Sequence, residues 1–177
     1  MAKARIATMW LDGCSGCHMS LLDMDERLID VARQIELVYG PLVDAKIFPE
    51  NVEVTLIEGA ISSDEDEERA LLARKNSKII VALGDCAVTT NVPGMRNVHR
   101  VGHVLERVYQ DNGNADVSPP DQYVPRLIER VRPLHEVIEV DVYVPGCPPP
   151  ADAIHYVLVE LLAGRTPDLT ELTRFGA

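Results

Sequence analysis

The chain has 177 residues, of which 46% are hydrophobic and 25% are charged, and its formal net charge is -11. This length and composition predict a single globular domain over residues 1–177 with its own hydrophobic core. Because phosphate groups repel a chain this acidic, neither nucleic acid nor an anionic membrane surface is an expected partner. No apolar run reaches the roughly 20 residues that span a bilayer, and no signal peptide is recognised, so a cytoplasmic location is expected.

Apolar patterning predicts three elements in the first third of the chain. Residues 5–11 are predicted to form a β-strand, residues 18–37 a helix that ends before a Gly-Pro pair, and residues 51–58 a second strand. The acidic run 64–68 follows two serines, which is typical of a helix N-terminus, because serine caps the helix and carboxylates favour its positive end. A recognition tail is the alternative for this acidic run.

The remaining elements complete an alternating pattern. Residues 77–83 contain a continuous β-branched run, which predicts a central parallel strand covered on both faces. Irregular chain with short helices is expected over 91–120, a helical turn over 127–131, a fourth strand over 137–144 and a last helix over 151–162. Strands that alternate with helices predict an α/β fold with an open, mostly parallel sheet and helices on both faces.

All four cysteines lie in loops that follow predicted strands. Cys14 and Cys17 form a C-x-x-C pair after the first strand, Cys86 follows the third strand, and Cys147 follows the fourth. In an open parallel sheet such loops meet at one edge, where ligands bind. Since four thiolates are the usual ligand set of a four-iron cluster, the sequence predicts one [4Fe–4S] cluster on these residues.

Three alternative roles of the cysteines stay open. A zinc site made of four cysteines usually has two close pairs, whereas this chain has one pair and two single cysteines. Unrelated buried cysteines would be expected inside apolar strands rather than in loops rich in Gly and Pro. A redox pair of Cys14 and Cys17 would leave Cys86 and Cys147 unexplained. A zinc-stapled or cluster-free binding module of α/β fold is therefore the alternative function.

Four motifs, taken together, resemble the small subunit of [NiFe]-hydrogenases. They are Trp10-Leu11 ahead of the C-x-x-C pair, Glu58-Gly59-Ala60-Ile61, Gly84-Asp85-Cys86-Ala87 and Pro145-Gly146-Cys147-Pro148-Pro149. The resemblance implies a flavodoxin-like fold that carries the proximal [4Fe–4S] cluster on Cys14, Cys17, Cys86 and Cys147. It also implies a partner, the large subunit with the nickel–iron site, packed against this cluster.

Two absences narrow the resemblance. No cysteine follows Cys147, where longer small subunits have further cluster ligands, and no twin-arginine export signal is present. Both features resemble the short small subunit of cytoplasmic, bidirectional NAD-reducing hydrogenases, in which electrons pass to a diaphorase module with iron–sulfur clusters and flavin. The implied activity is that of a hydrogen:NAD+ oxidoreductase whose catalytic site lies on the partner. The related small subunit of respiratory NADH:quinone oxidoreductase has adjacent cysteines instead of C-x-x-C.

Several residues near the cysteines have open roles. Many family members carry Glu in place of Gly13 and Thr in place of Asp85, which bears on the cluster potential. By the resemblance Glu58 lies near the cluster, where it would relay protons or form structural hydrogen bonds; a plain strand-end carboxylate is the alternative. His18 is expected to face solvent, and Trp10 to be a packing residue. The expected backbone N–H donors to cluster sulfurs are those of Ser15, Gly16, Ala87 and Gly146.

A flavin is not expected in this chain, although flavodoxin-like folds can bind one. Flavodoxins hold the flavin phosphate in the loop after the first strand, and here residues 12–17 of that loop contain two expected cluster ligands. The remaining histidines show no metal-ligand spacing with the cysteines and are expected to be ordinary residues: His99, His103, His135 and His155.

Overall fold

The centre of the molecule is a five-stranded parallel sheet. The computed structural model describes residues 3–111 and 118–173, so part of the predicted irregular region 91–120 lies outside it. The strand order is β2-β1-β3-β5-β7, which counts as 2-1-3-4-5 among these strands and is the order of flavodoxin-like folds. The strands are β1 (Ala4–Trp10), β2 (Ile35–Tyr39), β3 (Val52–Glu58), β5 (Ser77–Leu83) and β7 (Val142–Val144). The predicted open parallel sheet is therefore confirmed.

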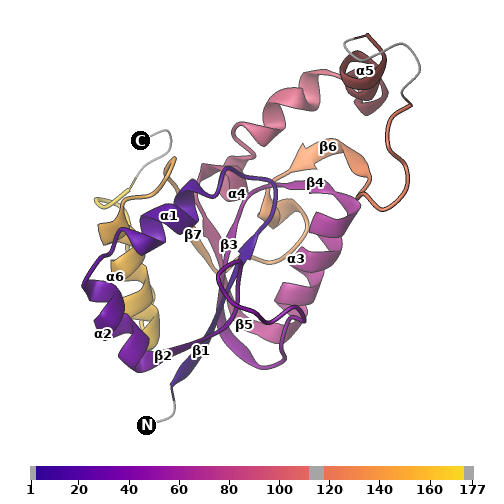
Figure 1. The fold of residues 1–177 in the computed structure, drawn as a ribbon. Coiled ribbons are helices and arrows are strands. Elements are labelled where there is room, and N and C mark those ends of the chain that lie inside the picture. Colours follow the sequence, from indigo (N-terminus) through magenta and orange to yellow (C-terminus); the bar gives the residue numbers. More distant parts are fainter. Residues whose placement is uncertain (1–2, 112–117, 174–177) are drawn as a thin grey trace.

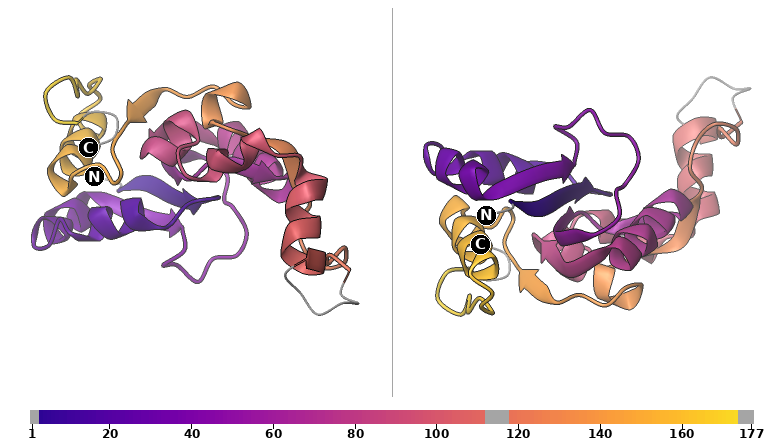
Figure 2. Two further views of the ribbon diagram at one scale, coloured as in Figure 1. Left: turned by 90° about the horizontal axis from the view of Figure 1, so that it is seen from above. Right: turned by 90° about the horizontal axis from the view of Figure 1, so that it is seen from below.

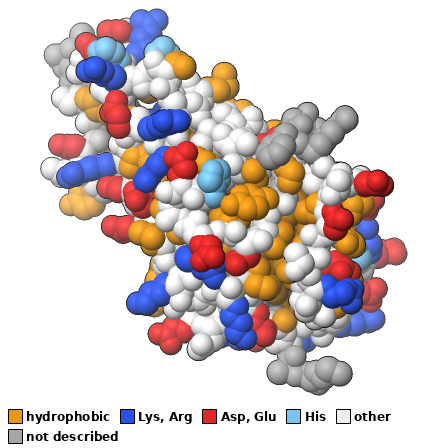
Figure 3. All heavy atoms as spheres, turned by 180° about the vertical axis from the view of Figure 1, so that it is seen from behind, with side chains coloured by type: hydrophobic (Ala, Val, Ile, Leu, Met, Phe, Trp, Pro, Cys, Tyr) orange, Lys and Arg blue, Asp and Glu red, His pale blue; other side chains and the backbone are white. Residues whose placement is uncertain are grey.

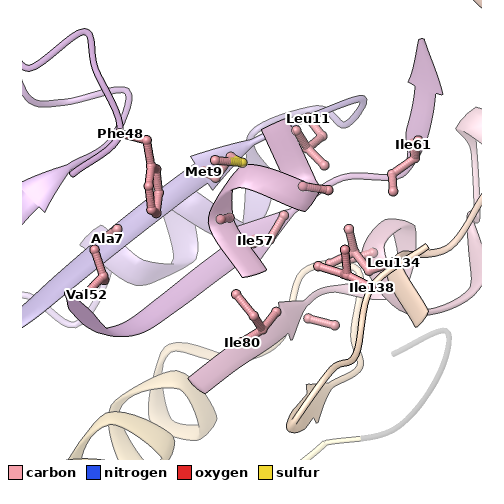
Figure 4. Close-up of a cluster of buried hydrophobic side chains, with 14 of the residues drawn as sticks. Ala7, Met9, Leu11, Phe48, Val52, Ile57, Ile61, Ile80, Leu134 and Ile138 are labelled. Carbon is pink, nitrogen blue, oxygen red and sulfur yellow. The ribbon is translucent and has the colours of Figure 1, made fainter. Parts of the chain in front are cut away.

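Helices cover both faces of this sheet, as predicted (Figures 1 and 2). Since alternate strand residues point to opposite faces, each strand contributes to two hydrophobic cores. One core lies under α3 and α4, and Figure 4 shows Met9, Ile57 and Ile80 meeting there from three neighbouring strands. The other core lies under α1, α2 and α6 and includes Leu56 and Val81. The helices are α1 (Gly16–Leu22), α2 (Arg27–Gln34), α3 (Asp64–Asn76), α4 (Asp85–Thr89) and α6 (Ala151–Leu162).

An arm extends from one end of the sheet (Figure 1). Its base is a small antiparallel ladder, and its tip carries α5. Arg96 joins the two strands of the ladder, because its guanidinium donates to the carbonyls of Ser62 (3.0 Å) and Ile128 (2.9 Å). The arm consists of β4 (Ile61–Ser63), η1 (Pro93–Val98), α5 (Val101–Glu106), η2 (Arg107–Asp111) and β6 (Leu127–Arg132).

The single helix predicted over 18–37 is wrong in its middle and at its end. Asp25 adopts a positive φ of 51°, which interrupts the helix and separates α1 from α2. The chain then becomes β2 at Ile35, and Leu37 pairs with Ile6 of β1. The apolar residues that continued the helical period belong to an edge strand, so pairing in the sheet overrides the local pattern.

Two predictions in the second half of the chain are also corrected. Residues 127–131 form β6 rather than a helical turn, because they pair with β4, a three-residue strand that was not predicted. Of the strand predicted over 137–144, only Val142–Val144 pairs as β7, after the short helix η3 (Leu134–Glu136). Just before β7, the carboxylate of Asp141 accepts the N–H of Ile80 at 2.7 Å and replaces a ladder hydrogen bond.

The acidic run after the two serines is a helix start, as predicted. Ser63 Oγ accepts the N–H of Asp66 at 3.1 Å, and Asp66 Oδ2 accepts the N–H of Ser63 at 3.0 Å. This reciprocal pair is a capping box, which satisfies two backbone donors that would otherwise be unpaired at the end of α3. The helix is therefore fixed at the point where the chain leaves the arm.

The capping box predicts a measurable contribution to stability. Replacing Ser63 with Ala removes the acceptor for the Asp66 N–H and should lower the free energy of unfolding by about 1 kcal/mol. Glu68→Ala is the control, since Glu68 is exposed on the same helix and its loss should change that free energy by less than about 0.5 kcal/mol. Urea denaturation measures both, and equal effects would contradict the role of the cap.

Candidate metal centre

Four parallel strands end in one row. Trp10, Glu58, Leu83 and Val144 are consecutive cross-strand partners in β1, β3, β5 and β7. The loops that follow these residues therefore leave the sheet side by side, at the edge where open α/β sheets bind ligands. Three of these loops contain the four cysteines, and all four cysteines are free thiols.

The first loop places Cys14 and Cys17 differently. Cys14 is exposed, and the N–H of Gly16 points to its sulfur at 3.4 Å. Ser15 adopts a left-handed φ of 63°, which turns the chain into α1. Cys17 lies in the first turn of α1 and is only 7% exposed. One thiol therefore faces outward, whereas the other is packed against the sheet.

Cys86 and Cys147 lie in the loops after β5 and β7. Cys86 is half-buried in α4, and Cys147 is exposed. The side-chain amide of Asn91 donates to the sulfur of Cys147 at 3.3 Å. No sequence pattern indicates this contact, because Asn91 and Cys147 are 56 residues apart.

Gly84 brings the cysteine loops into contact. A Cβ atom at this position would lie 2.2 Å from Cys17 Sγ and 3.5 Å from the carbonyl oxygen of Gly146. Gly84 also has a positive φ of 82°, which an L side chain rarely adopts. The Cys17 thiol therefore occupies the space that a side chain at position 84 would fill. Gly84 lies two residues before Cys86, so this contact links the first cysteine loop to the second.

The thiols interact electrostatically. Burial, then the charge of Glu58 and then the other three cysteines raise the pKa of Cys17 above its usual range. Burial, followed by Cys147 and Cys14, raises the pKa of Cys86 to about 11. The other three cysteines thus lie close enough to oppose ionisation of Cys17, and Cys147 and Cys14 close enough to oppose ionisation of Cys86. A bound polynuclear cation would relieve this repulsion.

The residues at this edge fit an iron–sulfur cluster. They offer four thiols, a glycine-made recess around the most buried of them, and an N–H group aimed at Cys14. Among the described residues, no group of three or more His, Cys, Asp and Glu side chains is arranged to hold a single metal ion. The ligands of a four-iron cluster each bind a different iron, so they are spaced more widely than the ligands of one ion.

Two buried acidic residues hold these loops. Glu58 Oε2 accepts the backbone N–H of His18 at 2.9 Å and lies 2.5 Å from His18 Nδ1. Asp85 Oδ1 accepts the N–H of Gly146 at 2.7 Å. His18 is therefore buried, and the expectation that it faces solvent is wrong. Its Nε2 has no hydrogen-bond partner in the described part of the chain.

The other expected roles near the cysteines have mixed outcomes. Trp10 is 43% exposed and donates its indole N–H to the carbonyl of Gly13, so it is not a core packing residue. Of the expected backbone donors, Gly16 does point to a cysteine sulfur, but the N–H groups of Gly146 and Ala87 are bonded to Asp85 and Gly84.

Comparisons with known proteins agree with the cysteine motifs. A family model described as NADH ubiquinone oxidoreductase, 20 Kd subunit, matches residues 14–161. The NAD-reducing hydrogenase HoxS subunit delta of Cupriavidus necator is 40% identical over 172 residues, which cover 94% of this chain and 82% of that protein. The F420-non-reducing hydrogenase of Methanothermobacter marburgensis has a subunit that is 42% identical over 173 residues, and the chain spans only 56% of the length of that subunit.

Solved structures show the same fold. A chain in the crystal structure of NAD+-reducing [NiFe]-hydrogenase in the H2-reduced state has a TM-score of 0.94 and 39% identity, with 98% of this chain and 99% of that chain covered. A chain of the [NiFeSe]-hydrogenase of Dm. baculatum, at 18% identity, 99% and 70% coverage and a TM-score of 0.62, supports the fold alone. The chain therefore belongs to the NADH ubiquinone oxidoreductase 20 kDa subunit family and, within it, to the small subunits of [NiFe]-hydrogenases.

Proposed function

We propose that this chain is the electron-transferring small subunit of a NAD-reducing [NiFe]-hydrogenase. It would carry the proximal [4Fe–4S] cluster on Cys14, Cys17, Cys86 and Cys147, between the nickel–iron site of a large subunit and a diaphorase module. The observation that carries this proposal is the row of strand ends, from which three loops present all four free cysteines at one edge of the sheet. The NAD-reducing type is favoured by 40% identity to HoxS subunit delta over most of both chains.

The residues at the edge suit a fixed redox site. Bound there, a [4Fe–4S] cluster would supply one-electron chemistry. Cys17, with 7% exposure, would hold its iron on the protein side, where water is excluded. Cys14 and Cys147 are exposed, so a second protein surface is needed to keep water from the outer side. The chain alone would therefore exclude water from only one side of the cluster.

An apolar surface beside the cysteines suits such a partner. η1 follows the α4 helix that contains Cys86, and its Met95 and Val98 are 71% and 81% exposed. Val92, three residues before Met95, is 62% exposed as well, and apolar side chains exposed at neighbouring positions are typical of a surface that binds another protein. On the side of the molecule opposite to the view of Figure 1, hydrophobic side chains gather over the body below the arm (Figure 3). We assign the large subunit to the cysteine edge and to η1.

Further parts of the proposal concern the whole assembly. No helix within the described residues is long and apolar enough to cross a membrane. A cytoplasmic location, a diaphorase partner, a chain that forms one domain over residues 1–177 and the lack of a flavin in it all stay predictions. Hydrogen oxidation itself would occur on the large subunit.

Metal analysis of the anaerobically purified complex tests the proposal. Four irons and four acid-labile sulfides for this chain, with an EPR signal on reduction and a nickel-containing partner that co-purifies, are the expected results. One zinc ion without sulfide would instead indicate a zinc-stapled binding module and would end the proposal.

Loss of single ligands gives a second test. Cys86→Ser and Cys147→Ser should each remove the cluster or convert it to one with fewer irons, because a hydroxyl is a poor substitute for a thiolate ligand. Iron content per chain and the EPR spectrum of the reduced protein measure this loss. If either variant kept the iron content and spectrum of the unaltered chain, the ligand set would be wrong.

The recess at Gly84 gives a third test. Gly84→Ala would place a Cβ against Cys17 Sγ in a backbone conformation unfavourable to Ala, at a cost of roughly 1–3 kcal/mol. We expect lower cluster occupancy and a lower free energy of unfolding. Gly102→Ala is the matched control, since no atom lies within 4 Å of its Cβ position and it is helical. Similar iron occupancy in both variants would show that the recess is not needed.

A further inference from the structure

Glu58 and Asp85 are the two acidic residues among the buried polar residues of the described chain, with 1% and 6% exposure. Both stand at the cysteine edge, Glu58 at the end of β3 and Asp85 directly after β5 and Gly84. Carboxylates are rarely buried unless they are paired, because their desolvation is costly. We therefore expect each of these two carboxylates to accept hydrogen bonds from the cysteine loops.

Glu58 fixes the turn that contains Cys17. Helix α1 has no side-chain cap of its own at Ser15, so its first N–H groups depend on other acceptors. Glu58 Oε2 accepts the N–H of His18, the residue after Cys17, and also contacts the His18 ring. A strand end 40 residues away thus acts as the cap of the helix that carries a cysteine.

Asp85 performs the equivalent task between the other two loops. Its Oδ1 accepts the N–H of Gly146, the residue before Cys147, and its own N–H donates to the carbonyl of Gly146 at 2.9 Å. Cys86 follows Asp85 directly, so this pair of bonds ties the Cys86 loop to the Cys147 loop. Each buried carboxylate therefore accepts the backbone N–H of a residue adjacent to a cysteine.

We propose that Glu58 and Asp85 are positioning residues that hold the cysteine loops in place for the cluster, and that the charge of Glu58 also lowers the reduction potential. The inference rests on the proposed cluster. The carboxylate of Glu58 is buried against the backbone N–H and the ring of His18, the residue after Cys17, and a buried anion this close to a cluster ligand disfavours the addition of an electron. A purely structural cap would stabilise the fold without any effect on this potential.

Isosteric and truncated variants of the full chain, purified with its partners, separate these roles. Glu58→Gln and Asp85→Asn keep an oxygen that accepts the backbone N–H, so iron occupancy should stay at the level of the unaltered chain. Glu58→Gln should shift the midpoint potential in the positive direction. Glu58→Ala and Asp85→Ala remove the acceptor and should lower iron occupancy.

Asp141→Asn is the matched control. Asp141 also accepts a strand N–H, that of Ile80, but it precedes β7, at the end of that strand opposite Cys147. Its replacement should leave both iron occupancy and potential unchanged. A Glu58→Gln potential equal to that of Asp141→Asn would overturn the assigned effect of charge. Full iron occupancy in both alanine variants would overturn the positioning role.

Hydrogen exchange of the chain within its purified complex keeps this inference separate from the proposed function. The His18 amide should exchange roughly tenfold faster in Glu58→Ala, and the Gly146 amide roughly tenfold faster in Asp85→Ala, because each loses its buried acceptor. Unchanged exchange would overturn the positioning role of Glu58 and Asp85 even if the cluster is present. If the chain binds no iron but both amides exchange faster, the proposed cluster is refuted, whereas the two hydrogen bonds are confirmed.

Discussion

The register of the parallel sheet is the constraint that sets the geometry of the candidate site. Trp10, Glu58, Leu83 and Val144 stand in one row, so the loops that follow begin at the same level. A slip of one residue in β5 would turn its side chains to the other face and move Gly84 away from the Cys17 sulfur. Buried β-branched side chains on both faces prevent such a slip, because they fill two separate cores. Packing far from the cysteines thereby sets their spacing.

The close approach of the cysteine loops also affects the ionisation of two thiols. Burial raises the pKa of Cys17 and of Cys86, and the neighbouring cysteines and Glu58 raise both further. In the absence of a cation these raised pKa values favour the protonated thiols of Cys17 and Cys86. Assembly of an iron–sulfur cluster would displace these protons and relieve the repulsion, so cluster binding and local order would be coupled. The hydrogen bonds of Glu58 and Asp85 limit how far the loops can spread before that step.

Local signals in the sequence were sufficient for much of this arrangement. The β-branched strand Ser77–Leu83, the capped start of α3 and the helix Ala151–Leu162 were predictable because their patterns are contained within each segment. The strand β2 and the ladder of β4 and β6 were not, since pairing with a distant partner decides them. Likewise, cysteines at strand ends indicate a shared edge, whereas the roles of His18 and Asp85 depend on which backbone N–H group reaches each acid in three dimensions.

The decisive measurement is a crystal structure of the anaerobically purified complex, with an anomalous difference map collected at the iron edge. We expect one compact four-iron peak, with Cys14, Cys17, Cys86 and Cys147 each at bonding distance from a different iron. An iron peak held by other residues, or any of these four sulfurs left out of contact with it, would contradict the proposed ligand set.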